Sequence, residues 1–446
     1  MLLNTYLPYY KRNLIVAIPV ILSQLGQVLV SQVDIMMVGV LGTVELAAVA
    51  FANSVFMIGM LFGIGFSFGL TPLVGQVWTK KNYRASGELL RNSFFTNTMM
   101  AFLLSVIMIT ISFFFDHMGQ DDEVVALALP YYRILVASLL PFIWFFTFKQ
   151  FAEGMGNTMN AMIITLVANF LNIVLNYVLI FGKWGFEAYG LNGAGFATLL
   201  SRIMMPIVFF IVFRYRKIFW RYWVYAWYSR IKYSSVMNLI KMGVPISLQI
   251  LLEVLAFALT AIMAGWLGVV PLAAHQIAIG LATVTFMIVT GISSATTIRV
   301  SHQYSHADFQ GVKKATYASV HLVWVFMSFT ALSFLLFRNL LPELYSHDLE
   351  VISLAAQLLI MAAVFQLFDG TQVVILGALR GLADVKHAMI YSALSYIFIG
   401  LPLGYLFAFI LEWGVMGLWV GLVAGLASAA LLFFRRFLHI YRALSV

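Results

Sequence analysis

The sequence predicts an all-α integral membrane protein with twelve transmembrane helices, arranged as two parallel six-helix repeats. Hydrophobic residues make up 63% of the 446 positions and charged residues only 10%, whereas soluble domains carry about 25% charged residues. Residues 17–76 recur as residues 243–302 at a constant offset of 226, and 18 of these 60 positions are identical. The identities include Gly and Pro, such as Pro19 and Pro245, which a Leu- and Val-rich composition would not align by chance. We therefore expect two copies of one ancestral bundle.

Twelve apolar stretches have the length of about 20 residues that a helix needs to cross a bilayer. They lie near residues 13–38, 47–75, 92–115, 124–148, 158–181, 192–214, 238–264, 272–300, 315–337, 351–376, 387–410 and 415–436. The one long break is residues 214–237, whose basic and aromatic side chains suit a cytoplasmic membrane interface. We expect an N-lobe of residues 1–213, an interfacial linker of residues 214–237 and a C-lobe of residues 238–446.

The charged residues are sorted by side of the membrane. If the N-terminus is cytoplasmic, the cytoplasmic helix ends hold 22 of the 26 Lys and Arg residues, Arg380 among them, and the outer loops are acidic. The positive-inside rule then places both termini in the cytoplasm of a multi-pass protein of the inner (plasma) membrane. The net charge of +9 therefore indicates the lipid bilayer as partner and not nucleic acid. We expect a monomer.

Three carboxylates lie within the predicted spans, at Asp34, Glu253 and Asp369. A carboxylate at membrane depth costs several kcal/mol unless it is protonated, paired or exposed to water, so such residues are candidates for a functional site. Two carboxylates in one dry site repel each other, so Glu253 and Asp369 together could hold a shared proton or be neutralised by a cation. We expect all three to take up a coupling cation, with no other cofactor.

Polar residues follow the same helix faces as these carboxylates. The polar stripes are Gln24, Gln27, Ser31 and Asp34; Asn169, Asn172 and Asn176; Gln249, Glu253 and Thr260; and Phe365, Gln366 and Asp369. Their spacing puts the members of each stripe on one face of a helix. We expect a substrate pathway to be lined by Gln27, Gln249, Asn172, Asn176 and Gln366. For each Gln and Asn, an interhelical hydrogen bond that only holds helices together is an equal alternative.

The charges are not duplicated with the scaffold. At the offset of 226, Glu253 aligns with Gln27, and at an offset of 225, Asp369 aligns with Trp144. This asymmetry predicts that each lobe carries its own chemistry.

Three further ionisable residues within the spans have no assigned role. Arg133 and Arg202 lack a carboxylate at nearby helical spacing, and we expect Arg133 near the outer end of its span. His275 begins a span, where packing at the helix start is favoured over a part in a proton relay.

Six motifs spread over residues 11–437 carry a family resemblance. They are VDIMMVGVLGTVELAAVA at 33–50, NIVLNYVLIFG at 172–182, GVPISLQILLEVLAF at 243–257, LAAHQIAI at 272–279, VFQLFDGTQ at 364–372 and GALRGLADV at 377–385. Through them the chain resembles a multidrug and toxic compound extrusion (MATE) transporter of the NorM-type branch. The resemblance implies a MATE-like fold of two six-helix lobes around a central cleft. It also implies export of amphipathic cations by alternating access, in exchange for inward Na+ or H+.

The same resemblance implies roles for single residues. Glu253 and Asp369 match the acidic pair implicated in cation coupling, which makes them candidate Na+ ligands, and Asp34 matches the acidic residue of the first helix. Phe365 and Phe286 stand where members of the family often have Tyr. Their rings lack the hydroxyl but could still meet a cation, so we count both among the residues expected to line the cleft.

We therefore predict a secondary active multidrug efflux antiporter, not an enzyme, that exports hydrophobic cationic drugs or dyes. The alternative is a flippase for lipid-linked oligosaccharides, built on a related bundle. Its cavity would have to hold pyrophosphate and should present several Arg or Lys at membrane depth, whereas this chain has two isolated arginines against three carboxylates. A membrane-bound prenyl or glycosyl transferase would need clustered Asp, His or metal-ligand motifs, which the sequence lacks.

Overall fold

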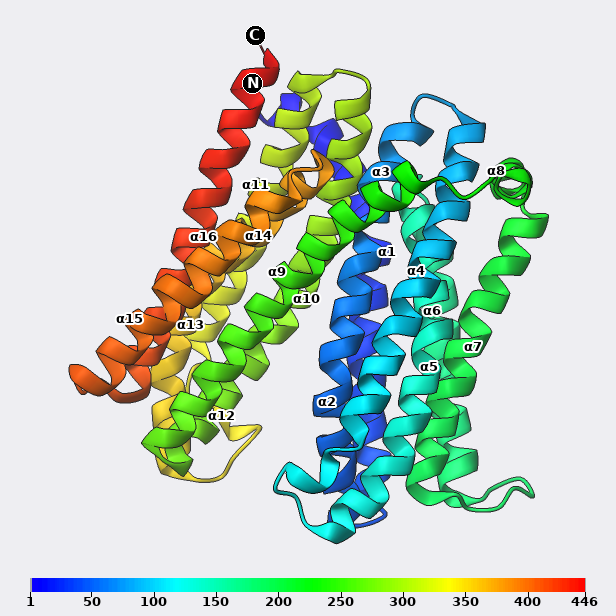
Figure 1. The fold of residues 1–446 in the computed structure, drawn as a ribbon. Helices are drawn as coiled ribbons and strands as arrows, with labels where there is room; N and C mark the ends of the chain where they lie inside the picture. Colours follow the sequence, from blue (N-terminus) through cyan, green and yellow to red (C-terminus); the bar gives the residue numbers. More distant parts are fainter. Residues whose placement is uncertain (1, 446) are drawn as a thin grey trace. The chain divides into compact units, whose positions relative to one another are not determined.

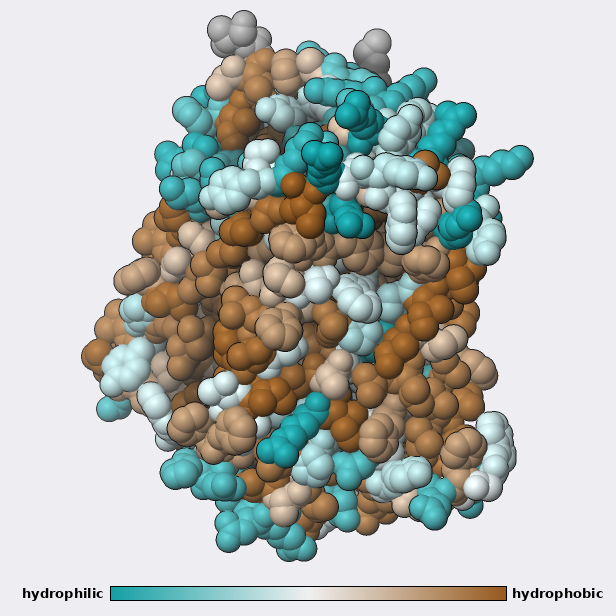
Figure 2. Space-filling model, turned by 45° about the vertical axis from the view of Figure 1, so that its right-hand side comes forward, coloured by the Kyte–Doolittle hydropathy of each residue, from teal (hydrophilic) through white to brown (hydrophobic). Residues whose placement is uncertain are grey.

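The computed structural model describes residues 2–445, with side chains described for residues 5–444. This part of the chain is helical without any β-strand, and twelve helices are long and apolar enough to cross a membrane. The predicted fold class is therefore confirmed. On the face shown in Figure 2, hydrophobic side chains cover the middle of the helices and hydrophilic side chains gather at their ends.

The twelve spans correspond to helices labelled in Figure 1. They are α1 (Leu2–Gly39), α2 with α3 (Thr43–Phe68 and Leu70–Trp78), α4 (Tyr83–Ser112), α5 (Asp122–Gly154), α6 (Thr158–Phe181), α7 (Gly190–Tyr215), α9 (Tyr233–Leu267), α10 (Val269–Ser305), α11 (Phe309–Leu336), α13 (Leu349–Gly381), α14 (Val385–Ala393) continued by η2 (Leu394–Gly400), α15 (Leu401–Tyr405) and η3 (Leu406–Ile410), and α16 (Gly414–Ser445). The short elements are η1 (Phe115–His117), α8 (Lys217–Tyr228) and α12 (Leu340–Glu343). The segments η2 and η3 are π-helical.

Several helices begin earlier than their apolar stretches predict. In α4 the Asn82 side chain accepts a hydrogen bond from the backbone N–H of Ala85 at 3.0 Å, and in α11 Asp308 accepts from that of Gly311 at 2.8 Å. Such caps satisfy the free N–H groups of a first helical turn. The helix therefore starts at its polar cap, several residues before its apolar part.

The chain divides into two compact units. Unit 1 comprises Met1–Ile21 and Leu248–Val446, and unit 2 comprises Leu22–Ser247. The boundaries fall within α1 and α9, at positions separated by the repeat offset of 226. The first part of α1 thus belongs to the unit of the second repeat, and the first part of α9 to the unit of the first repeat. The lobe boundaries at residues 213 and 238 stay a prediction.

Contacts within each unit hold the first parts of α1 and α9, which we call the exchanged helix starts. In unit 1, Asn13 of α1 donates a hydrogen bond to the Ser319 hydroxyl of α11 at 2.8 Å. In unit 2, the Ser247 hydroxyl of α9 donates to the carbonyl of Phe62 in α2 at 2.8 Å. Each of the two long helices therefore contributes to both units.

The described ends of the chain lie at the same end of unit 1 (Figure 1), and their cytoplasmic location stays a prediction.

Close helix packing repeats between the units. A Cβ added at Gly154 would lie 2.8 Å from the Thr71 carbonyl oxygen, and one added at Gly381 would lie 2.8 Å from that of Thr297. Thr71 and Thr297 are repeat partners at the offset of 226. Small residues allow such close approach of helices in a membrane protein.

The register of the repeat changes in the fourth helix of each half. Gly154 and Gly381, which make equivalent contacts, are 227 residues apart. The offset of 225 that aligned Asp369 with Trp144 is therefore wrong by two residues. The structural counterpart of Asp369 is Phe142.

The predicted linker contains one short amphipathic helix. On α8, Phe219, Tyr222 and Ala226 are buried, and the Phe219 ring stacks on Phe213 of α7 at 4.4 Å between centroids. The remaining side chains include exposed aromatic residues such as Tyr228. The helix is thus fastened to unit 2 by its apolar face, and its interfacial role stays a prediction.

We predict that Gly381→Ala lowers the melting temperature, because the added methyl group would overpack the contact with the Thr297 carbonyl by roughly 1–3 kcal/mol. Gly280→Ala is the matched control, since a Cβ there would meet nothing within 4 Å. Thermal unfolding of the purified variants in detergent measures the effect. Equal melting temperatures for the two variants would contradict the packing role of Gly381.

Candidate functional site

In unit 1, Glu253 on α9 and Asp369 on α13 have one amide partner in common. Gln372, one helical turn after Asp369, donates from Nε2 to Asp369 Oδ1 at 3.3 Å and to Glu253 Oε1 at 3.4 Å. Asp369 and Gln372 are buried, and Glu253 is half-buried. The structure therefore brings the two predicted carboxylates together, and adds Gln372 as a bridging residue that the sequence analysis missed.

A second amide links Glu253 to a positive charge. Gln249, one turn before Glu253 on α9, donates from Nε2 to Glu253 Oε2 at 3.2 Å. Its Oε1 accepts a hydrogen bond from Nη2 of Arg380, in the last turn of α13. The charges of Arg380 and Glu253 interact electrostatically. Arg380, counted from the sequence only as a cytoplasmic basic residue, thus belongs to the carboxylate cluster.

The cluster offers oxygen ligands for a hard cation. The carboxylates of Glu253 and Asp369 are joined by Gln372, whose Oε1 is buried and has no hydrogen-bond partner among the described residues. Carboxylate and amide oxygens are ligands that hard cations prefer. Within residues 2–445, no group of three or more His, Asp or Glu could hold a metal ion.

Aromatic side chains pack beside the cluster. The Phe365 ring is buried, edge-on to Phe257 at 6.1 Å and tilted against Trp419 at 5.5 Å. His275 is also buried and meets Trp419 edge-on at 6.0 Å. Phe365 and His275 are therefore packed inside unit 1, and the role of His275 stays a prediction.

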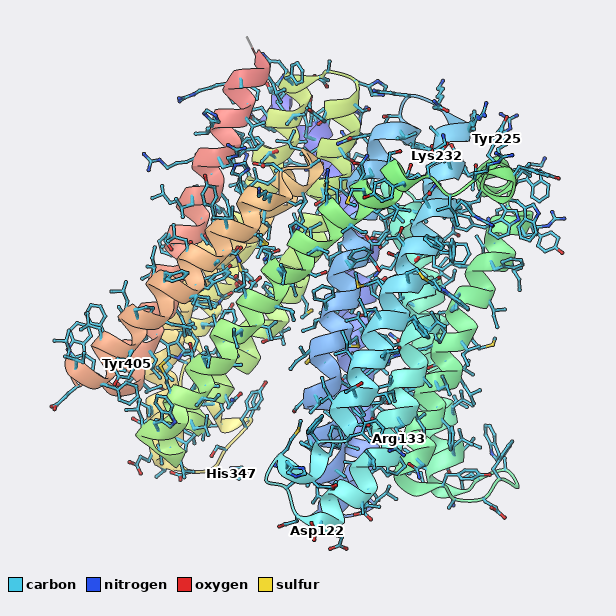
Figure 3. All side chains as sticks on the ribbon, viewed as in Figure 1. Asp122, Arg133, Tyr225, Lys232, His347 and Tyr405 are labelled. Carbon is cyan, nitrogen blue, oxygen red and sulfur yellow. The ribbon has the colours of Figure 1, made fainter. Side chains whose placement is uncertain are left out.

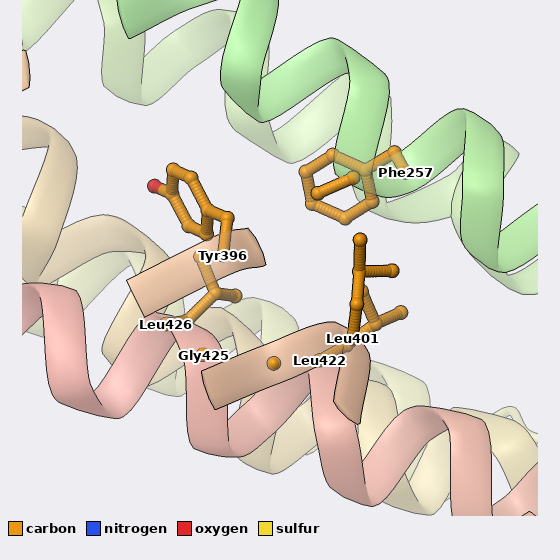
Figure 4. Close-up of a pocket in the computed structure, with 8 residues that line it drawn as sticks. Phe257, Tyr396, Leu401, Leu422, Gly425 and Leu426 are labelled. Carbon is orange, nitrogen blue, oxygen red and sulfur yellow. The ribbon is translucent and has the colours of Figure 1, made fainter. Parts of the chain in front are cut away.

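A small cavity lies one turn after Glu253 on α9 (Figure 4). It has a volume of about 10 Å³ and is lined by Ala256, Phe257 and Tyr396 together with residues of α15 and α16. This volume is close to the minimum that holds one water molecule. Tyr396 lies on the π-helical η2, and its buried hydroxyl lacks a hydrogen-bond partner within the described part of the chain. Such π-helical turns are frequent at functional sites.

Two of the predicted cleft-lining residues of unit 1 have other contacts. Gln366 is fully buried, and its Oε1 accepts a hydrogen bond from the Thr330 hydroxyl of α11 at 2.7 Å. This contact is of the interhelical kind that was the alternative for each Gln. Phe286 is half-buried and packs against the hydrophobic core of unit 1. Their role in a substrate pathway stays a prediction.

In unit 2, Asp34 begins a chain of hydrogen bonds across three helices. Its Oδ1 accepts from Nδ2 of Asn176 on α6 at 2.5 Å. That nitrogen also donates to Asn172 Oδ1 at 3.3 Å, and Asn172 in turn donates to the Ser201 hydroxyl of α7 at 3.4 Å. The predicted residues Asp34, Asn172 and Asn176 thus form one network.

Arg202 supplies the positive charge of unit 2. Its Nη1 donates to the Ser138 hydroxyl at 2.8 Å, and its guanidinium lies over the Phe142 ring at 4.4 Å and the Phe56 ring at 5.3 Å. Its charge interacts electrostatically with that of Asp34. The partner of Arg202 therefore lies on another helix, which spacing along one helix could not reveal.

The counterparts of the unit 1 carboxylates carry no charge in unit 2. Phe142, the counterpart of Asp369, provides the ring under Arg202. Gln27, the counterpart of Glu253, is half-buried, and its Nε2 has no hydrogen-bond partner among the residues described. Arg133 is exposed on α5, toward the end of unit 2 that carries Asp122 and away from Tyr225 and Lys232 (Figure 3).

Comparison with known proteins gives consistent family matches. The MatE family model matches residues 19–178 and 245–406, and the starts of the two matches are separated by the repeat offset of 226. A probable multidrug resistance protein NorM of Rhizobium meliloti is 33% identical, covering 99% of this chain and 96% of its own. The multidrug resistance protein NorM of Photobacterium profundum is 30% identical, covering 96% and 95%.

Solved structures share the fold. The eukaryotic MATE transporter AtDTX14 superposes with a TM-score of 0.85 at 20% identity, covering 98% of both chains. A multidrug resistance MATE family transporter in an outward-facing conformation gives a TM-score of 0.85 at 21% identity, covering 98% and 97%. This chain therefore shares the fold of these structures over 98% of its length.

We predict that Asp34 and Arg202 stabilise unit 2 together. Asp34→Asn and Arg202→Met should each lower stability, whereas the double variant should lose less than the sum, with a coupling of roughly 0.5–3 kcal/mol. Unfolding by SDS titration measures the cycle. Asp34→Asn combined with Arg133→Met is the control pair, for which additive losses are expected. Additive losses for Asp34 and Arg202 as well would contradict the interaction.

Proposed function

Because the chain belongs to the MatE family of multidrug transporters, we propose that it is a secondary active antiporter that exports amphipathic organic cations in exchange for inward Na+ or H+. The carboxylate pair of unit 1 is the observation on which this proposal rests. Glu253 and Asp369 come from different helices and are joined by one amide of Gln372. Uptake of a cation there would remove the repulsion between them.

Coupling requires that the cation binds one conformation better than the other. A ligand with equal affinity for two states shifts nothing, however tightly it binds. Glu253 and Asp369 lie on α9 and α13, so a shift of α9 would change the distance between the two carboxylates. The affinity of the pair for a cation would then depend on the conformation of the transporter.

The exchanged helices supply the movement in this proposal. Both α1 and α9 begin in one unit and end in the other, and Pro19 and Pro245 lie two residues before the respective boundaries. A proline inside a helix removes a backbone hydrogen bond and allows a kink. Bending of α1 and α9 at these prolines would accompany alternating access.

The substrate follows from the balance of charge. Asp34, Glu253 and Asp369 are the carboxylates of the candidate site, and the two arginines beside them are already engaged: Arg202 with Ser138 and Phe142, Arg380 with Gln249. A hydrophobic cation is attracted to such a site, whereas the pyrophosphate of a lipid-linked oligosaccharide would need free positive groups. The flippase alternative is therefore not favoured.

We propose a monomer in the inner membrane with both termini cytoplasmic.

We predict that Glu253→Gln and Asp369→Asn, each correctly inserted, reduce dye export at least tenfold, because each substitution removes one of the two negative charges that attract the coupling cation. Ethidium efflux from inverted vesicles, under separately imposed Na+ and pH gradients, measures the loss and identifies the ion. Glu343→Gln, at an exposed residue of α12, is the control and should export normally. Wild-type export by the Glu253 and Asp369 variants would disprove the proposal.

We also predict that Pro19→Ala and Pro245→Ala slow export without loss of folding, because a restored backbone hydrogen bond makes each helix harder to bend. The turnover rate under a fixed ion gradient measures the effect, with the melting temperature as the check on folding. Pro206→Ala is the control, since Pro206 also lies inside a helix, α7, that stays within unit 2. An equal effect of all three substitutions would exclude a specific role in bending.

A further inference from the structure

Arg380, in the last turn of α13, is linked to the carboxylate pair through one amide. Its guanidinium donates to Gln249, and Gln249 donates to Glu253. A permanent positive charge is thus held one amide away from the carboxylate pair. Gln249 is buried, with 2% of its surface exposed, and Glu253 and Arg380 are half-buried.

The repeat shows that the scaffold does not require an arginine here. At the offset of 227 that relates Gly154 to Gly381, the counterpart of Arg380 is Glu153. Glu153 is buried and lies 3.9 Å from Lys149, four residues earlier on the same helix. Unit 2 therefore carries the opposite charge at this position and neutralises it locally. The positive charge of Arg380 is specific to the unit that holds the carboxylate pair.

The two units differ in their balance of charge. With both carboxyl groups ionised, Glu253, Asp369 and Arg380 sum to one negative charge. In unit 2, Asp34 and Arg202 sum to zero. Because an uncompensated buried charge is costly, the first cluster needs one monovalent cation to become neutral and the second needs none.

We propose that Arg380 is a positioning residue that holds Gln249 against Glu253, and that its charge limits the Glu253 and Asp369 pair to one monovalent coupling cation in each cycle. The proposal rests on the antiport function and adds to it the site and number of coupling ions. Asp34 then serves as the partner of Arg202 and not as a second ion site.

The positive charge also explains how the ion can leave. Without Arg380, the pair would carry two negative charges and would hold a first cation more tightly than an exchange cycle allows. Tyr396 is a further ionisable side chain whose charge would interact with this cluster. As a neutral phenol it adds a dipole and leaves the count unchanged.

The test compares variants that differ in the charge of the cluster. Arg380→Gln raises it to two negative charges, Glu253→Gln lowers it to zero, and the double variant returns it to one. We therefore expect Arg380→Gln to bind the cation most tightly and Glu253→Gln to bind it most weakly. Wild type and the double variant should have equal, intermediate affinity. Adjacent steps should differ about tenfold or more, given the short distances between the charges. Arg380→Lys keeps the charge and should bind as wild type.

The measurement is the dissociation constant of purified protein for the ion that drives wild-type export, from NaCl titrations at fixed pH or pH titrations without Na+. Arg133→Gln, on an exposed arginine of α5, is the control and should bind as wild type. The key result is a gain of affinity in Arg380→Gln, which misfolding or lost packing cannot produce. If that variant does not fold, addition of Arg380→Gln to Glu253→Gln should still restore cation binding.

Unchanged or weaker binding in folded Arg380→Gln, or no rescue in the double variant, would overturn the inference. The antiport function fails separately, if export does not depend on Glu253 and Asp369. A third outcome is that export depends on both carboxylates but the cation affinities do not follow the charge of the cluster. This result would support the antiport function and disprove only the proposed role of Arg380.

Discussion

The cost of burying charge is the constraint on which the polar structure of this protein depends. Each carboxylate of the candidate site accepts a hydrogen bond from a side-chain amide: Asp34 from Asn176, and Glu253 and Asp369 from Gln372. In addition, Arg202 interacts with Asp34, and Arg380 interacts with Glu253. An amide can keep its hydrogen bond whether its partner is ionised, protonated or bound to a cation, because it has both donor and acceptor atoms. The clusters can therefore change charge without loss of packing.

The two repeats share their close helix packing but differ in their polar residues. Gly154 and Gly381 make the same close contact with a carbonyl oxygen in the two units, because any larger side chain would separate the helices there. By contrast, Asp369 has Phe142 as its counterpart, and Arg380 has Glu153. A polar residue can be replaced when its partners change with it, so the two copies could acquire different chemistry on one scaffold.

The sequence predicted the twelve spans because length and apolar composition determine which segments cross a bilayer. It also identified Asp34, Glu253 and Asp369, since a carboxylate in an apolar stretch stands out by itself. It did not identify Arg380 or Gln372 as their partners, nor Asp34 as the partner of Arg202, because these contacts join different helices. The alignment slipped by two residues around Asp369, because the register of this helix is visible only in the contacts that Gly154 and Gly381 make. Hydropathy also did not predict that the first parts of α1 and α9 belong to the opposite units, because hydropathy does not depend on which helices pack together.

The exchanged helix starts have a consequence for biosynthesis. Unit 2 is complete only when the ribosome has made the chain as far as Ser247, well past the connection that separates the two repeats. Residues before Leu22, although made first, must wait for α10 and α11 before their own partners exist. Two fragments cut within residues 214–237 would each lack a helix start held by the other. The halves of this duplicated protein are thus mutually dependent during assembly.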